Sequence, residues 1–242
     1  MEEVLVLLAG GLAKRLRPLT DNIPKCMLEF NAVPFIQHQI ELLIKKGFKN
    51  ILICAGYLGE QIKKFIGEGK CFKARITYSF DGNKLLGTGG AILNAKDLLS
   101  DSFFILYGDS YLDINYKKIL EIFKKSNHLG LMTVFKNNNL YDKSNAVFKN
   151  DTIILYDKKN ITSEMNYIDY GLSILRKNAL SLIKTEDGYY ELADLLNILS
   201  KKNQLLGFEI KKRFYEIGSV KGIEDFNDYI IKKYKRRKYD SK

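Results

Sequence analysis

Short apolar runs that end at glycine or at a polar residue constrain the fold of this chain more than any other feature. Val4–Ala9 (VLVLLA) leads into a glycine pair, and Asn50–Ala55 and Phe103–Tyr107 are similar runs further along the chain. Helical patterns such as Leu58–Ile66 lie between them. Strands that are apolar on both faces and alternate with helices indicate a doubly wound, mainly parallel sheet with helices on both faces. We therefore expect an α/β fold.

The alternation of strands and helices changes after about residue 128. Short strand patterns then follow one another, and helices are expected only near Lys177–Lys184 and Tyr190–Lys201 and from about Val220 into the tail. We expect one domain over residues 1–231, with a more antiparallel second half from about residue 128, and a basic tail at 232–242.

The charge of the chain is concentrated in that tail. The net charge is +11, and residues 232–242 contain seven basic side chains and one acidic one. A basic chain can bind nucleic acid, an anionic membrane surface or small anionic substrates. Because more than half of the excess lies in the last eleven residues, the body is only mildly basic, and no nucleic-acid partner is expected.

Composition also restricts location and cofactors. The chain has no apolar run of the about 18 residues that a membrane span needs, and its N-terminus lacks the basic start of a signal peptide. Three cysteines without C-x-x-C spacing indicate neither a disulfide framework nor a zinc site. We expect a cytoplasmic protein without membrane insertion, either a monomer or a homodimer.

The segment from Leu8 to Thr20 (LAGGLAKRLRPLT) has the chemistry of an anion-binding loop. Paired glycines allow backbone N–H groups to approach a ligand closely, and Arg15 and Arg17 can bind phosphate oxygens. Lys25, in PKCM, adds a further cation. The loop contains neither G-x-x-x-x-G-K-[ST] nor G-x-G-x-x-G. A dinucleotide-dependent oxidoreductase is therefore a remote alternative.

This loop resembles the signature of the sugar-1-phosphate nucleotidyltransferases, or NDP-sugar pyrophosphorylases: L-A-G-G-x-x-x-R-L-R-P-L-T followed by P-K-x-M. GYLGEQI, LGTGGA, YGD and FYEIGS resemble later segments of that family, so the resemblance covers nearly the whole chain. The short form, without a β-helix extension, resembles mannose- or heptose-1-phosphate guanylyltransferases. The fold that it implies is Rossmann-like and of the GT-A type.

The resemblance implies a nucleotide-binding half at about 1–127, a sugar-phosphate-binding half at about 128–231, and a role for individual residues. The nucleotide would contact Leu8, Ala9, Gly10, Gly11, Arg15, Gly87, Thr88 and Gly89. The sugar phosphate would contact Lys25, Asp157, Lys158, Asp169 and Gly171. Asp109 and Glu216 would bind Mg²⁺, and Arg15, Lys25 and Asp109 would be catalytic.

Three of these positions depart from the family pattern: Asp157 replaces Glu, Asp169 replaces Asn and Glu216 replaces Asp. The departures at Asp157 and Asp169 leave the identity of the sugar open.

The implied reaction joins an NTP and a sugar 1-phosphate, with Mg²⁺, to give an NDP-sugar and pyrophosphate for polysaccharide or glycoconjugate synthesis. Uridylyl-, thymidylyl- and cytidylyltransferases of similar length remain alternatives to a guanylyltransferase. A protein that binds polyanions through the basic tail is an alternative of a different class.

Overall fold

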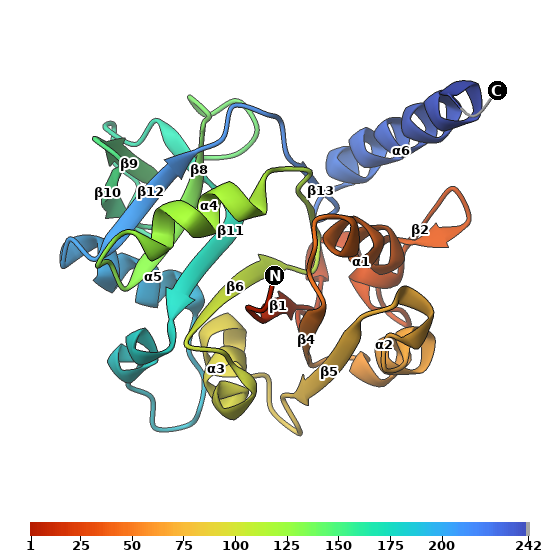
Figure 1. The fold of residues 1–242 in the computed structure, drawn as a ribbon, viewed down its shortest axis with the longest axis horizontal. Helices are drawn as coiled ribbons and strands as arrows, with labels where there is room; N and C mark the ends of the chain where they lie inside the picture. Colours follow the sequence, from red (N-terminus) through yellow and green to blue (C-terminus); the bar gives the residue numbers. More distant parts are fainter. Residues whose placement is uncertain (241–242) are drawn as a thin grey trace.

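The computed structural model describes the backbone of residues 1–240 and the side chains of residues 1–235, and within that range it forms a nine-stranded mixed sheet (Figure 1). The strand order is β5-β4-β1-β6-β11-β8-β12-β10-β9. In chain order these strands are β1 (Leu5–Leu8), β4 (Asn50–Ala55), β5 (Arg75–Phe80), β6 (Ser102–Tyr107), β8 (Gly130–Lys136), β9 (Ala146–Lys149), β10 (Thr152–Tyr156), β11 (Tyr167–Arg176) and β12 (Leu205–Glu209).

The first half of the sheet is parallel and doubly wound, as predicted. β1 pairs in parallel with β4 on one side and with β6 on the other, and β5 extends the sheet beyond β4. All of β1 is buried, which agrees with its continuous apolar sequence. The carboxyl ends of these strands meet at one edge of the sheet, where ligands of such folds bind.

The second half is more antiparallel, also as predicted. β11 lies between β6 and β8 and is antiparallel to both. β12 is parallel to β8, and the outer strands β9 and β10 are antiparallel to each other. β11 therefore joins the two halves into one continuous sheet.

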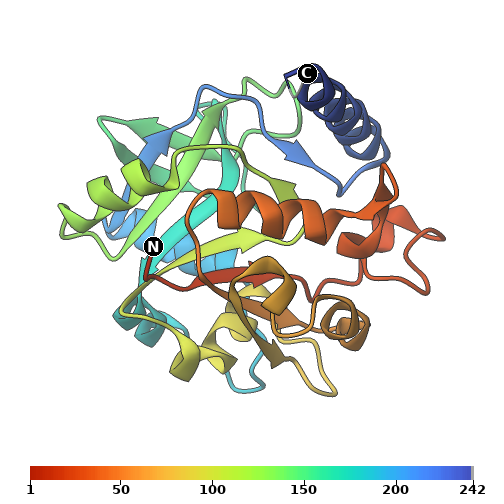
Figure 2. The ribbon, with the colours of Figure 1, turned by 45° about the vertical axis from the view of Figure 1, so that its right-hand side comes forward.

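Helices cover both faces of the sheet. α1 (Phe35–Lys45), α2 (Gly59–Ile66), α4 (Tyr116–Lys124) and α6 (Val220–Asp240) contribute to one apolar core, and α3 (Gly87–Asn94) and α5 (Leu192–Lys201) to the other. Figure 2 shows α1 and α4 in front of the sheet. The apolar residues of α4 and α5 lie on one stripe of each helix, which is why these helices pack with one face on the sheet.

Two short strand pairs were not predicted from the sequence: β2 (Glu29–Phe30) with β3 (Val33–Pro34), and β7 (Ser110–Tyr111) with β13 (Tyr215–Glu216). The helix expected near Lys177–Lys184 is only a 3₁₀ segment, η5, at Lys177–Leu182. Since pairs of two residues have no repeating pattern, the sequence carries little signal for them.

The last helix packs on the body at least as far as Tyr234, and its C-terminal end extends away from the body (Figure 1). The Phe226 ring lies 4.8 Å from the Phe30 and Phe35 rings, centroid to centroid. The predicted basic tail, 232–242, falls partly outside the description: residues 241–242 are not described, and neither are the side chains of 236–240.

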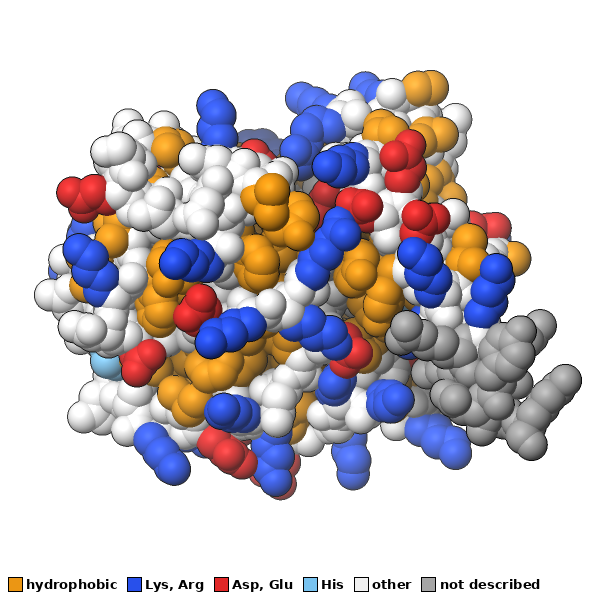
Figure 3. All heavy atoms as spheres, turned by 90° about the horizontal axis from the view of Figure 1, so that it is seen from above, with side chains coloured by type: hydrophobic (Ala, Val, Ile, Leu, Met, Phe, Trp, Pro, Cys, Tyr) orange, Lys and Arg blue, Asp and Glu red, His pale blue; other side chains and the backbone are white. Residues whose placement is uncertain are grey.

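On the face seen in Figure 3, Lys and Arg side chains are scattered among acidic and apolar ones. Within the described chain, no helix combines the length and the apolar character that crossing a bilayer requires.

Candidate active site

A cavity of about 310 Å³ lies at the carboxyl ends of β1 and β6, and we call it the nucleotide cavity. Most of the residues predicted to bind the nucleotide line it, together with two of those predicted to be catalytic: Leu8, Ala9, Gly10, Gly11, Gly87, Thr88, Lys25 and Asp109. Gly89 and Arg15 are not among its lining residues. Segments far apart in the sequence thus meet at the edge of the sheet where the parallel strands end.

The glycine pair of the first loop serves two purposes. A Cβ on Gly10 would lie 3.1 Å from the backbone nitrogen of Gly56, so glycine allows the loop after β1 to pack on the loop after β4. A Cβ on Gly11 would meet nothing within 4 Å. Gly10 therefore positions the loop, whereas Gly11 leaves its backbone open to the cavity.

A second cavity, of about 230 Å³, adjoins the first, and we call it the acceptor cavity. Its lining includes three residues predicted for the site: Arg15, Asp169 and Glu216. A Cβ on Gly218 would lie 2.7 Å from Glu216 Oε2, 3.2 Å from Asp109 Oδ2 and 3.4 Å from a terminal nitrogen of Arg15. Because Asp109 lines one cavity while Arg15 and Glu216 line the other, residues from the linings of both cavities lie close together around Gly218.

Lys25 and Asp109 form an ion pair within the nucleotide cavity. Lys25 Nζ lies 2.5 Å from Asp109 Oδ2, and both side chains are about three-quarters buried. Lys25 belongs to a 3₁₀ segment, η2 (Lys25–Met27), and Asp109 follows β6. Buried Gln39 on α1 fixes the turn after β6, because its amide donates to the carbonyl oxygens of Tyr107 at 2.9 Å and Ser110 at 2.6 Å.

Glu216 reaches the site through the short pair of β7 and β13, which places it opposite Ser110. Its carboxylate accepts hydrogen bonds from the backbone N–H of Gly218 and from the Ser219 hydroxyl, the latter at 2.7 Å. Ser219 Oγ also accepts from Gly222 N–H at 3.0 Å, at the start of α6. The positive end of the α6 dipole therefore stabilises the negative charge of Glu216.

The predicted sugar-phosphate residues divide into two groups. Lys158 Nζ lies 3.5 Å from the buried carboxylate of Asp169 and over the Tyr107 ring, and Asp169 Oδ1 accepts from Gly171 N–H at 2.9 Å. Burial lowers the pKa of the Lys158 ammonium, but Tyr107 and Asp169 outweigh it, so that the pKa lies above its ordinary value. Lys158, Asp169 and Gly171 are thus brought together.

Asp157 is not brought to either cavity. Its Oδ1 accepts hydrogen bonds from the backbone N–H groups of Lys159 at 2.7 Å and Asn160 at 2.9 Å, which closes a turn after β10. The backbone hydrogen bond from Asn160 is the main reason that the pKa of the Asp157 carboxyl lies below its ordinary value, and the one from Lys159 acts in the same direction. A contact between Asp157 and a sugar therefore remains a prediction.

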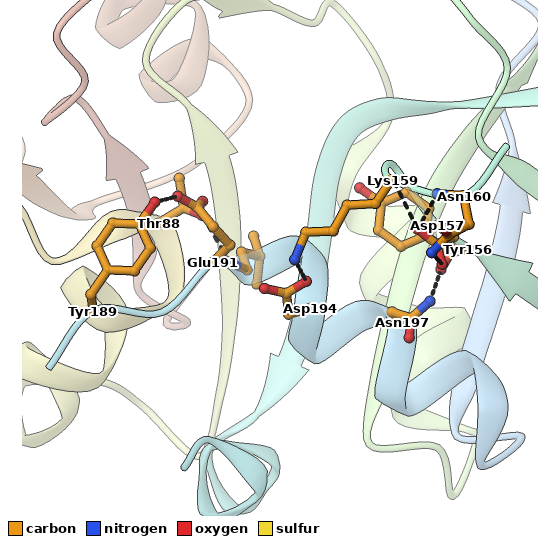
Figure 4. Close-up of polar contacts among 10 residues, drawn as sticks. Thr88, Tyr156, Asp157, Lys159, Asn160, Tyr189, Glu191, Asp194 and Asn197 are labelled. Atoms are coloured by element: carbon orange, nitrogen blue, oxygen red, sulfur yellow. Dashed lines mark hydrogen bonds and ion pairs between the residues drawn. The ribbon is translucent and has the colours of Figure 1, made fainter. Parts of the chain in front are cut away.

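The glycine-rich start of α3 (residues 87–90) is held by the segment before α5 (Figure 4). Gly89 N–H donates to the Tyr190 carbonyl oxygen at 2.8 Å, so this donor is not free for a nucleotide. The Thr88 hydroxyl donates to Glu191 Oε2 at 2.6 Å, and the Tyr189 hydroxyl donates to Glu191 Oε1 at 2.5 Å. Glu191 thus holds the start of α3 in place.

The nucleotide cavity is also lined by residues that were not predicted, among them Asp81, Tyr189 and Glu191. Asp81 Oδ2 accepts from Leu86 N–H at 3.3 Å, and its Oδ1 is buried without a partner among the described residues. Burial raises the pKa of the Asp81 carboxyl. Glu191 directly precedes the first residue of α5. This position at the start of a predicted helix is the local feature by which the sequence could have pointed to Glu191.

The N-terminal part of α5 also holds the segment that follows β10 (Figure 4). Lys159 Nζ lies 2.7 Å from Asp194 Oδ1, and Asn197 Nδ2 donates to the Tyr156 carbonyl oxygen at 2.6 Å. One helix therefore contacts both the glycine-rich start of α3, which lines the nucleotide cavity, and the segment that carries Lys158.

Cys26 lies in the lining of the nucleotide cavity as a packing residue. Burial raises the pKa of its thiol to about 12, so this cysteine stays protonated at neutral pH. Arg17, which the sequence also placed in the anion-binding loop, pairs with Asp21 on the surface at 3.2 Å.

Comparison with known proteins finds guanylyltransferases among the sequence relatives of this chain. Mannose-1-phosphate guanylyltransferase catalytic subunit beta from Xenopus tropicalis is 28% identical over 222 residues, covering 89% of this chain and 61% of that protein. The chain thus spans about three fifths of the length of this and similar relatives. D-glycero-alpha-D-manno-heptose 1-phosphate guanylyltransferase from Campylobacter jejuni is 29% identical over 175 residues, which is 72% of this chain and 76% of that protein.

Solved structures share the fold. HddC from Yersinia pseudotuberculosis, complexed with GMP-PN, has a TM-score of 0.79 and 23% identity, covering 94% of this chain and 99% of that one. A Bacillus anthracis structure described as a putative glucose-1-phosphate thymidylyltransferase has a TM-score of 0.82 and 21% identity, covering 93% and 94% of the two chains. The nucleotidyl transferase family model matches residues 4–233, and this chain belongs to that family.

Proposed function

We propose that this protein transfers a nucleotidyl group from GTP to mannose 1-phosphate or heptose 1-phosphate, giving a GDP-sugar and pyrophosphate. The observation that carries the proposal is that Asp109, from the lining of one cavity, and Glu216 and Arg15, from the lining of the other, lie close together around Gly218. One cavity suits the triphosphate and the other suits the acceptor, so the reacting groups would meet between them.

The oxygen of a sugar phosphate is already a nucleophile, so the protein has to align it with the α-phosphorus and offset negative charge. Backbone N–H groups at Gly10 and Gly11 and the Lys25 ammonium line the nucleotide cavity and would bind the triphosphate. Arg15, at the boundary, would contact phosphate oxygens from the side of the acceptor cavity.

The residues present fit a magnesium ion. Asp109 Oδ2 and Glu216 Oε2 lie 3.2 Å and 2.7 Å from the position that a Cβ on Gly218 would take. Mg²⁺ in such sites uses one or two carboxylates together with phosphate oxygens. No cluster of three or more acidic, histidine or cysteine side chains suited to a metal exists among the described residues, so phosphates would complete the coordination. When bound, the ion would offset negative charge on the phosphates.

Asp81 places an acidic side chain in the lining of the nucleotide cavity. Guanine presents two adjacent donors, N1–H and N2–H₂, to a carboxylate acceptor, whereas uracil and thymine present only one N–H donor. A guanine base would suit this residue. The guanylyltransferases among the sequence relatives support the same choice.

Nucleoside triphosphates and free thiols are both compatible with a cytoplasmic enzyme. Cys26, Cys54 and Cys71 are all unpaired. In this setting the product would be a precursor for polysaccharide or glycoconjugate synthesis.

Pyrophosphate release tests the function, measured with GTP, UTP, dTTP and CTP against mannose 1-phosphate, a heptose 1-phosphate and glucose 1-phosphate. We expect turnover with GTP and a manno-configured acceptor, dependent on added Mg²⁺ and abolished by EDTA. A preference for another nucleotide would refute the guanylyl assignment, and no release with any pair would refute the function as a whole.

A further inference from the structure

An exposed aromatic side chain forms part of the wall of the acceptor cavity. Tyr141 lies in the loop between β8 and β9, lines the cavity and remains 41% exposed. Its ring packs edge-on against Phe214, with centroids 5.6 Å apart, and tilted against Phe135 at 5.9 Å. Tyr141 thus rests on an aromatic base while part of its surface stays open.

Arg213, which lies just before β13, contacts this ring and holds it in place. Its guanidinium carbon lies 5.2 Å from the centroid of Tyr141 and also 5.2 Å from that of Tyr215. The same guanidinium pairs with Asp225 at 2.5 Å. Because a planar guanidinium can stack and form an ion pair at once, Arg213 links the loop to β13 and α6.

The loop that carries Tyr141 is ordered by its own hydrogen bonds. Buried Asn137 donates to the Asp142 carbonyl oxygen at 2.7 Å and accepts from Tyr141 N–H at 3.1 Å. Buried Ser144 accepts from Asn139 N–H at 3.1 Å. The wall is therefore preformed, as is usual for small-molecule sites.

We propose that the Tyr141 ring is the platform on which the acceptor sugar lies, and that Arg213 is the residue that positions it. This inference rests on the proposed function. A pyranose has an apolar face of C–H groups, which suits an aromatic ring, and a rim of hydroxyl groups, which suits carboxylate acceptors. Asp142 lines the same cavity and supplies such an acceptor, while Arg15, also in the lining, would contact the phosphate. The cavity thus fits a neutral, polyhydroxylated sugar 1-phosphate rather than a uronic acid 1-phosphate.

The test compares steady-state kinetics of Tyr141→Ala, Tyr141→Phe, Arg213→Lys and the matched control Leu140→Ala with the accepted sugar 1-phosphate. Leu140 is the exposed neighbour of Tyr141 and is not among the lining residues of the cavity. Tyr141→Ala should raise KM for the sugar 1-phosphate about tenfold and leave KM for GTP unchanged. Tyr141→Phe keeps the ring and should restore most of the affinity lost in Tyr141→Ala, whereas Leu140→Ala should behave as the wild type.

Arg213→Lys keeps the positive charge opposite Asp225 but removes the planar guanidinium that lies over the Tyr141 ring. It should therefore raise KM for the sugar 1-phosphate, as Tyr141→Ala does. Saturation-transfer difference NMR gives a second readout, independent of turnover. Ring protons of the sugar 1-phosphate should receive saturation from the wild type and from Tyr141→Phe, and markedly less from Tyr141→Ala.

Two results would overturn the inference while leaving the function intact: an active Tyr141→Ala enzyme with unchanged KM for the sugar 1-phosphate, or equal changes in KM for both substrates. A KM for a uronic acid 1-phosphate as low as that for the neutral sugar would also overturn it. Absence of pyrophosphate release with every pair of substrates would refute the function, and the inference with it.

Discussion

Lys25 Nζ lies 2.5 Å from Asp109 Oδ2. The same carboxylate oxygen lies 3.2 Å from the position that a Cβ on Gly218 would take, close to Glu216 and Arg15. The pair combines a segment before α1 with the end of β6. Its charges offset each other, and a triphosphate entering the nucleotide cavity offers Lys25 a second anionic partner.

Replacing Lys25 with Met should lower kcat for pyrophosphate release by roughly 100- to 1,000-fold, because a preorganised charge near the transferred phosphoryl group is lost. Circular dichroism should show an intact fold. Lys14→Met is the matched control, since Lys14 is exposed in the preceding segment, residues 8–20, and is not among the lining residues of either cavity. A Lys25→Met enzyme within a few-fold of the wild type would contradict the assignment.

The two arginines of the first loop should respond differently to mutation. Arg15 lines the acceptor cavity, whereas Arg17 pairs with Asp21 at the surface, where both side chains are close to half exposed. Arg15→Ala should reduce kcat/KM by roughly 100-fold or more, as expected for loss of a charge-assisted phosphate contact. Arg17→Ala should retain nearly full kcat/KM, because exposed ion pairs contribute little. Similar losses in both variants would argue against a phosphate contact specific to Arg15.

Adding a side chain at Gly222 should destabilise the protein, because Gly222 packs closely against Glu216. A Cβ there would lie 2.5 Å from the Glu216 backbone oxygen and closer still to its carboxylate. Alanine gains about 1 kcal/mol in helix propensity, but forcing apart a backbone contact costs about 1–3 kcal/mol. We expect Gly222→Ala to lower the free energy of unfolding by about 1 kcal/mol in urea titrations.

The exposed neighbour Glu224→Ala serves as the control for this substitution and should change that free energy by about 0.5 kcal/mol or less. A Gly222→Ala protein more stable than the wild type would show that Glu216 can move away at little cost.

Asp113 should make stability depend on pH in the acid range. Burial raises the pKa of its carboxyl, but Lys46 at 2.6 Å and Lys212 at 3.1 Å together lower it below the ordinary value. A carboxyl whose pKa is lower in the folded state stabilises it above the unfolded pKa of about 3.9, and this stabilisation is lost as pH falls through the folded pKa.

Asp113→Asn should therefore reduce the free energy of unfolding by about 1 kcal/mol or less at pH 7, and the difference from the wild type should shrink below about pH 4. Urea titrations over a pH series measure this, with exposed Asp228→Asn as the control. A difference that stays constant down to low pH would exclude the ion pairs as its source.

The fold could be predicted where apolar runs and glycines carry the signal. β1 and β4 are runs of buried residues, and the loop after β1 was located by its glycines. The contacts of Asp81, Tyr189 and Glu191 could not be predicted, because they depend on how distant segments pack. Asp157 is the converse case: its position beside Lys158 suggested a sugar contact, but a hydrogen-bonded turn engages its carboxylate.

Because β11 pairs with a strand of each half of the sheet, the two halves should fold and unfold together. Five register pairs join β11 to β6, and its opposite edge pairs with β8. A fragment that ends near residue 127 would leave the edge of β6 without a partner, which favours aggregation. We therefore expect the two substrate sites to behave as one cooperative unit, with a single unfolding transition that removes both, rather than as modules that can be exchanged or expressed separately.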